Sequence, residues 1–146
     1  MINNNLIINL NKPQWVTSQE AVTKAKRIFS AKKAGHAGTL DPIATGVLLV
    51  CLNEATKITR FLTEGDKEYA ARMKFGERTE TFDSEGKIIQ KTENFILDEK
   101  KIIETLKMFT GIIKQTPPMY SAVKVAGKPL YKLARKGISI ERPDRE

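Results

Sequence analysis

The stretch Gly35-His36-Ala37-Gly38-Thr39-Leu40-Asp41-Pro42 separates an amphipathic helical pattern from the most apolar run of the chain, Gly46–Leu52. Its two glycines permit backbone conformations that other residues resist. The proline biases Asp41 away from helical geometry. The sequence therefore predicts a loop that presents a carboxylate at the edge of a buried strand.

The residues on either side of this loop predict alternating strands and helices. Residues 6–10 read as a short strand that ends at Lys12-Pro13, and residues 47–52 as a central strand covered on both faces. Between them, Thr17 and Glu20 have the spacing of a capping box. Apolar residues then recur at helical period, which predicts a helix over 18–29. A second helix follows over 55–62 and ends at Gly65.

The second half of the chain predicts shorter elements. Alternation over 67–75 indicates a half-buried strand, and short strands are expected at 87–89 and 138–140. Asp98 is placed to cap a helix that ends at Gly111, and a short helix is expected over 130–134. The interspersed pattern favours an α+β fold with a mixed, mainly antiparallel sheet and flanking helices. At 146 residues, one compact domain is the default.

Composition narrows the class of partner. A formal net charge of +8 favours nucleic acid, although a merely basic protein remains open. A single cysteine and a single histidine argue against a zinc site, so we expect no metal. The chain shows neither a secretory leader nor an apolar run of membrane-spanning length, which predicts a cytoplasmic protein without a membrane partner.

From the residues alone, the chemistry stays open. Asp41 can act as a nucleophile, a general base or a metal ligand, and His36 has a structural or a functional role. Neither a G-x-S-x-G elbow nor a Walker A pattern is present. Aromatic and basic residues alternate over 115–132, which suits RNA contacts but also suits a loop packed on the core.

Four ordered segments closely resemble the TruB-type tRNA pseudouridine synthases. Residues 35–48 resemble the catalytic motif of this family, and residues 11–18 its Lys-Pro motif. Lys67-Glu68-Tyr69, followed by Gly76, Thr79, Thr81, Asp83 and Gly86, resembles its tyrosine strand and hairpin. Residues 115–124, with Gly127, Leu130-Tyr131 and Ala134-Arg135, resemble its RNA-gripping loop.

The resemblance implies the pseudouridine synthase catalytic-domain fold and the conversion of a T-loop uridine of tRNA to pseudouridine. It implies that Asp41 is the catalytic nucleophile, that His36 helps to hold the extruded nucleotide, and that Tyr69 stacks on the target base. It implies no metal or organic cofactor. With tRNA as partner we expect a monomer, whose candidate RNA contacts are Lys12, Met119, Tyr120, Lys124, Lys128 and Tyr131.

The chain departs from the family pattern at three places. Trp15 and Asn53 stand where the family usually has glycine, so we expect a shifted turn, or a ring packed over the loop, at Trp15 and a mild change at Asn53. Family members also continue well beyond the equivalent of Glu146, into a segment whose arginine pairs with the aspartate. We therefore expect residues 1–146 to be the N-terminal part of a catalytic domain that is nearly inactive alone. The alternative is a catalytically inactive RNA-binding or RNA-folding module.

Overall fold

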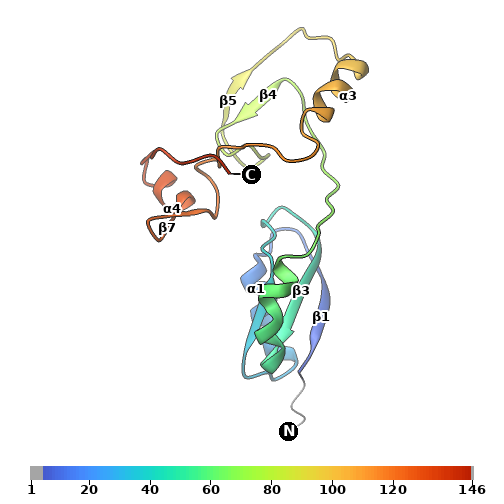
Figure 1. Cartoon of the computed structure of the whole chain (residues 1–146), viewed down its shortest axis with the longest axis vertical. Helices are drawn as coiled ribbons and strands as arrows, with labels where there is room; N and C mark the ends of the chain where they lie inside the picture. Colours follow the sequence, from blue (N-terminus) through green and yellow to red (C-terminus); the bar gives the residue numbers. More distant parts are fainter. Residues whose placement is uncertain (1–4, 146) are drawn as a thin grey trace. The chain divides into compact units, whose positions relative to one another are not determined.

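The computed structural model describes residues 5–145 and divides the chain into two compact units, Met1–Ala70 and Ala71–Glu146. The elements of the first unit are β1 (Ile7–Lys12), α1 (Ser18–Ile28), β2 (Ala34–Ala37), β3 (Gly46–Leu52), the 3-10 helix η1 (Asn53–Ile58) and α2 (Thr59–Thr63). Those of the second are β4 (Glu77–Thr79), β5 (Ile88–Lys91), α3 (Glu99–Lys107), β6 (Lys124–Val125), β7 (Lys128–Pro129) and α4 (Leu130–Ala134) (Figure 1). The α+β class is confirmed, and every strand pair within residues 5–145 is antiparallel.

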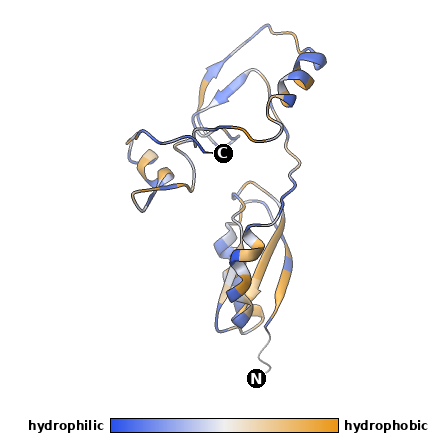
Figure 2. Cartoon of the chain, viewed as in Figure 1, coloured by the Kyte–Doolittle hydropathy of each residue, from blue (hydrophilic) through white to orange (hydrophobic). Residues whose placement is uncertain are grey.

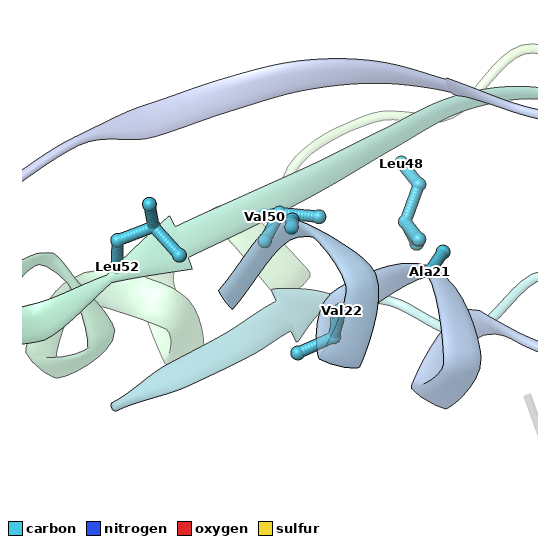
Figure 3. Close-up of a cluster of buried hydrophobic side chains, with 6 residues drawn as sticks. Ala21, Val22, Leu48, Val50 and Leu52 are labelled. Atoms are coloured by element: carbon cyan, nitrogen blue, oxygen red, sulfur yellow. The ribbon is translucent and has the colours of Figure 1, made fainter. Parts of the chain in front are cut away.

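A three-stranded sheet in the order β1-β3-β2 forms the first unit, with β3 at its centre as predicted. Leu48, Val50 and Leu52 alternate along β3 and share one face. Ala21 and Val22 of α1 lie against this face in Figure 3 and belong to the same buried cluster. Cys51, between two of these residues, is also fully buried, so both faces of β3 are covered at its C-terminal end. Figure 2 shows the contrast between the hydrophobic β3 and the polar β4.

Helix α1 begins as the sequence predicts. The Thr17 hydroxyl accepts a hydrogen bond from the Glu20 backbone N–H at 3.1 Å, and the Glu20 carboxylate accepts one from the Thr17 N–H at 2.7 Å. The predicted capping box is thus confirmed. The cap fixes the start of the helix, while burial of its apolar stripe against β3 fixes which face turns inward.

The sequence does not predict strand β2, because residues 34–37 fall within or next to the expected loop. They pair with β3 instead, with Gly35 opposite Cys51 and His36 opposite Val50. Alanine and glycine have low strand propensity, so their sequence carries no strand signal. The loop is accordingly shorter than expected and begins at Gly38, whose φ of +88° suits glycine.

Two predicted strands are wrong. The chain from Asp66 to Phe75 contains no strand, and Tyr69 and Met73 are exposed. Residues 138–140 are not a strand either. Within residues 5–145 neither segment pairs with another strand, and without a partner the backbone groups of an extended segment cannot form a ladder. Alternation of apolar and polar residues therefore indicates a segment with two different faces, but it does not show that a partner strand is present.

The β4–β5 hairpin is organised by the residues that carry the family resemblance there. One Asp83 carboxylate oxygen accepts hydrogen bonds from the Thr81 hydroxyl at 2.6 Å and from the Gly86 N–H at 3.2 Å. A Cβ at Gly86 would lie only 2.0 Å from the Thr81 hydroxyl oxygen. Glycine is therefore required for the close approach of these two segments.

The rest of the second unit consists of α3, capped by Asp98 as predicted, and of the β6–β7 hairpin leading into α4. The hairpin turn has positive φ angles at Ala126 (+48°) and Gly127 (+77°), the combination that a type I′ turn requires. Among residues 71–145, only Pro117 and Leu130 are buried. The second unit is consequently held mainly by local hairpins and turns.

Asn53 fixes the beginning of β2 from the end of β3, and a substitution tests how. Its φ is +54°, and its side-chain oxygen accepts a hydrogen bond from the Lys32 N–H at 2.8 Å. Asn53→Ala loses this bond and strains the backbone, so we expect the free energy of unfolding to fall by about 2 kcal/mol. Asn53→Gly keeps the left-handed backbone and should cost less. Urea unfolding followed by the fluorescence of Trp15, the only tryptophan, measures both variants; equal losses would contradict this account.

Glu54 gives the first unit a pH dependence. Hydrogen bonds from Lys57 and Lys33, at 2.6 and 3.0 Å, lower the pKa of Glu54 from 4.5 to about 2. Because the folded pKa lies below the unfolded one, this pair of contacts stabilises the fold above about pH 4.5 and ceases to do so as the pH falls toward 2. We expect an NMR titration of the Glu54 carboxyl to show a midpoint near 2, and Lys57→Met to raise it, whereas Lys24→Met leaves it unchanged. A midpoint near 4.5 in the unsubstituted chain would refute the assignment.

Candidate functional site

Asp41 lies in a tight turn between β2 and β3. The Ala44 N–H donates a hydrogen bond to the Asp41 carbonyl at 3.0 Å, and Pro42 occupies the second position of the turn. The Asp41 side chain is exposed. Within residues 5–145 its carboxylate has neither a hydrogen bond nor an ion pair. The turn thus presents an acceptor that is open to a bound molecule.

The residue before Asp41 is held by the first residue of α1. The Ser18 hydroxyl donates to the Leu40 carbonyl at 3.0 Å and accepts from the Leu40 N–H at 2.9 Å. Ser18 is buried, with 3% of its surface exposed, so solvent does not compete for these bonds. One hydroxyl therefore satisfies both backbone groups of Leu40.

The residue after Asp41 is held by the segment that follows β1. The Pro42 carbonyl accepts a hydrogen bond from the Trp15 N–H at 2.7 Å and a longer one from the Lys12 ammonium at 3.4 Å. The same ammonium donates to the carbonyls of Pro13, at 3.0 Å, and Val16, at 2.7 Å. The backbone on both sides of Asp41 is thus fixed by residues 12–18.

The burial of Lys12 contradicts one of the predicted RNA contacts. The sequence suggested that it contacts RNA, but the side chain is fully buried and its ammonium is enclosed by three carbonyl oxygens. A buried charge needs such partners, because removing an ammonium from water without them costs roughly several kcal/mol. Lys12 therefore acts within the protein, where it ties the end of β1 to the Asp41 turn, and it is not a surface cation.

His36 is half-buried on β2, and its ring makes a structural hydrogen bond. Its Nδ1 lies 2.6 Å from the Gly38 carbonyl oxygen, and because a carbonyl only accepts, Nδ1 carries the proton. In the neutral ring Nε2 is then an acceptor. The structural role is thus observed, and the second nitrogen is available for a ligand.

Tyr69 follows a lysine that lies against the glycine turn. The Lys67 ammonium donates to the Thr63 and Gly65 carbonyls at 2.7 and 2.6 Å, and its Cε lies 3.9 Å from where a Cβ at Gly38 would be. The Tyr69 side chain is 68% exposed. Among the described residues its ring has no hydrogen bond or ring contact with His36 or Asp41. The structure therefore brings the segment toward the turn but leaves the ring free.

The remaining predicted RNA contacts all lie in the second unit. Lys124 and Lys128 are exposed on the β6–β7 hairpin, whereas Met119, Tyr120 and Tyr131 are half-buried. The Arg135 guanidinium lies 5.5 Å from the centre of the Tyr131 ring. The lysines are thus accessible to phosphates, and the aromatic residues are partly used in packing.

None of the helices within residues 5–145 is long and apolar enough to cross a membrane. The same residues contain no cluster of three or more His, Cys, Asp or Glu side chains that could hold a metal ion. A shallow depression of about 440 Å³ on the polar face of α1 is lined by Thr17, Gln19, Glu20, Thr23, Lys24 and Arg27, and Asp41 is not among its lining residues.

Comparison with known families assigns the chain. Residues 26–146 match the family described as "TruB family pseudouridylate synthase (N terminal domain)". The chain belongs to this family. The matched region contains the Asp41 turn, the hairpin of β4 and β5, and the whole second unit.

Curated TruB relatives are named tRNA pseudouridine synthase B. One from Syntrophus aciditrophicus is 55% identical over 95% of this chain, and one from Legionella pneumophila strain Corby is 50% identical over 96%. The aligned residues make up 44% and 46% of these relatives. The chain therefore spans less than half the length of the relatives it matches.

Two solved structures share the fold. A Cbf5–Nop10–Gar1 complex contains a chain that is 35% identical, with a TM-score of 0.54 over 81% of this chain and 30% of that one. An H/ACA ribonucleoprotein "bound to a substrate RNA containing 2'-deoxyuridine" contains one that is 32% identical, with a TM-score of 0.52 over 76% of this chain and 30% of that one. Structure and sequence thus agree on the pseudouridine synthase fold of the TruB family.

Sequence reasoning missed the residues that hold the Asp41 turn. The sequence predicts Thr17 as the cap and includes Ser18 only within residues 11–18, which resemble the Lys-Pro motif. The feature of the sequence that could have indicated this role is a second hydroxyl residue, Ser18, directly after the cap and within the segment that resembles the TruB family. Its partner lies 22 residues away, which no local pattern reveals.

Ser18→Ala tests whether this hydroxyl holds the turn. It leaves the N–H and C=O groups of Leu40 without partners, so we expect the free energy of unfolding to fall by about 1–3 kcal/mol and exchange of the Leu40 amide hydrogen to accelerate. Thr23→Ala is the matched control, because that hydroxyl bonds only the Gln19 carbonyl on the exposed face of α1. Equal losses in the two variants would show that Ser18 has no special role.

Proposed function

We propose that this chain is part of an enzyme that converts a uridine in the T-loop of tRNA to pseudouridine. In this reaction the bond between N1 of uracil and C1′ of the ribose breaks, a bond from C5 to C1′ forms, C5 loses its proton and N1 gains one. Membership of the TruB family supports the reaction class. The names of the curated relatives support tRNA as the substrate.

The geometry of Asp41 is the observation that carries the proposal. Its carboxylate is exposed, and both neighbouring residues are held by hydrogen bonds to Ser18, Trp15 and Lys12. A carboxylate can act as a covalent nucleophile when it is held in position against the reacting atom. We assign this role to Asp41, whose unpaired carboxylate oxygens are free to attack the substrate.

His36 and Tyr69 complete the proposed site. Nε2 of His36 is free to accept a hydrogen bond from an extruded nucleotide, because Nδ1 is already bonded to Gly38. The exposed Tyr69 ring offers a stacking surface that offsets part of the energy lost when a base leaves its stack, and its hydroxyl can assist proton transfer at C5. The two residues therefore serve base flipping, while Asp41 serves bond breakage.

The second unit supplies the proposed grip on RNA. Lys124 and Lys128 lie on an exposed hairpin, where they can neutralise phosphates. Met119, Tyr120 and Tyr131 lie nearby in the sequence and add apolar and aromatic surface. The net charge of +8 strengthens this binding at low salt.

Asp41→Asn distinguishes the enzyme from an RNA-binding module without activity. We expect it to lower pseudouridine formation by at least about 1,000-fold, because an amide is a poor nucleophile, and to change RNA affinity by less than about threefold. Asp66→Asn, an equal charge change at another exposed position of the first unit, should retain activity. The assay measures tRNA binding by filter retention, and pseudouridine content by chromatographic separation of the digested nucleosides, because uridine and pseudouridine have the same mass.

Both readouts are needed because the chain spans 44% of the Syntrophus relative. Turnover is therefore measured with the chain alone and with the chain joined to the C-terminal part of that relative. Activity that survives Asp41→Asn in the joined protein contradicts the proposed nucleophile. Tight RNA binding without turnover in either form favours the inactive RNA-binding module instead.

A further inference from the structure

Trp15 has a backbone conformation that is unfavourable for a residue with a bulky side chain. Its φ is +66°, in the left-handed region that bulky residues rarely adopt. The side chain is 64% exposed, so burial does not compensate for this strain. The ring is thus largely open to solvent, and stability of the fold does not explain a tryptophan here.

The backbone that carries this ring is fixed on both sides. The Trp15 N–H donates to the Pro42 carbonyl at 2.7 Å. The carbonyl of the next residue, Val16, accepts a hydrogen bond from the buried Lys12 ammonium at 2.7 Å, and the same ammonium reaches the Pro42 carbonyl at 3.4 Å. Pro42 directly follows Asp41, so the indole stands on a rigid turn that is bonded to the residue beside the carboxylate.

We propose that Trp15 is a stacking platform for an unpaired RNA base that neighbours the nucleotide at Asp41. This inference rests on the proposed function. An exposed indole presents a flat π-face that accepts any base, and a backbone held by hydrogen bonds removes much of the ordering cost of binding. The hydrogen bond from the Trp15 N–H to the Pro42 carbonyl fixes the backbone that carries the ring next to the residue after Asp41, and the exposed ring there contributes RNA affinity.

The single tryptophan makes the proposal directly measurable. The probe is a synthetic T-arm hairpin RNA at low salt, titrated into the 146-residue chain. We expect quenching of Trp15 fluorescence that follows the same isotherm as the anisotropy of end-labelled RNA. Trp15→Gly should weaken binding by about 5- to 100-fold, the range for loss of one stacked base, and Trp15→Phe should retain most of the affinity.

Stability separates this role from a structural one. Because glycine adopts the left-handed angle freely, Trp15→Gly should leave the Tm within about 3 °C of the original, as followed by circular dichroism. Phe29→Ala is the matched control, since Phe29 is an exposed aromatic residue at the opposite end of α1. It should leave RNA affinity unchanged.

Three results would overturn the proposal. If the original chain binds RNA and Trp15→Gly binds equally well, the platform is wrong while the proposed function stands. If Phe29→Ala weakens binding as much as Trp15→Gly, the effect is not specific to the Asp41 turn. If neither the original chain nor the chain joined to the C-terminal part of the Syntrophus relative binds the hairpin, the proposed RNA substrate fails and the platform fails with it.

Discussion

The buried ammonium of Lys12 is the interaction on which the first unit depends. Its three carbonyl partners come from the segment after β1 and from the turn after Asp41. They converge only when β1, the start of α1 and this turn are all in their final places. An ammonium inside a protein is costly without acceptors, so a partly formed arrangement is penalised. The Lys12 ammonium therefore joins the end of β1 and the start of α1 to the Asp41 turn, and Ser18 holds this turn from the other side.

The helices and strands could be predicted from the sequence where buried residues recur at a regular spacing. The apolar stripe of α1, the continuous run of β3 and the Asp98 cap of α3 all appear in the sequence as they do in the structure. Strand β2 escaped prediction because its alanines and glycine carry no strand signal, and its pairing depends on β3. Residues 67–75 show the opposite error, since alternation without a partner strand leaves the segment extended and unpaired.

The residues of the candidate site also divide into those that the sequence predicts and those that it does not. Asp41 and His36 stand out in the sequence because glycines and a proline surround them, and the structure places both beside the same short turn. The position of Lys12 could not be predicted, because lysine in a basic chain resembles a surface cation and its partner at Pro42 lies 30 residues away. Trp15 and Asn53 stand where the TruB family usually has glycine, and both have left-handed φ angles. A mild change is expected at Asn53, whose side chain adds a hydrogen bond that glycine cannot make.

The burial of Cys51 has a practical consequence for spectroscopy. It is the only cysteine, it lies on the central strand, and its surface is fully covered. A thiol in this position reacts with alkylating reagents only when the sheet opens. A second cysteine introduced on the surface would therefore react first under native conditions and could carry a spin label or a dye without removal of the natural thiol. The slow reaction of Cys51 itself would then serve as an internal clock for opening of the β1-β3-β2 sheet.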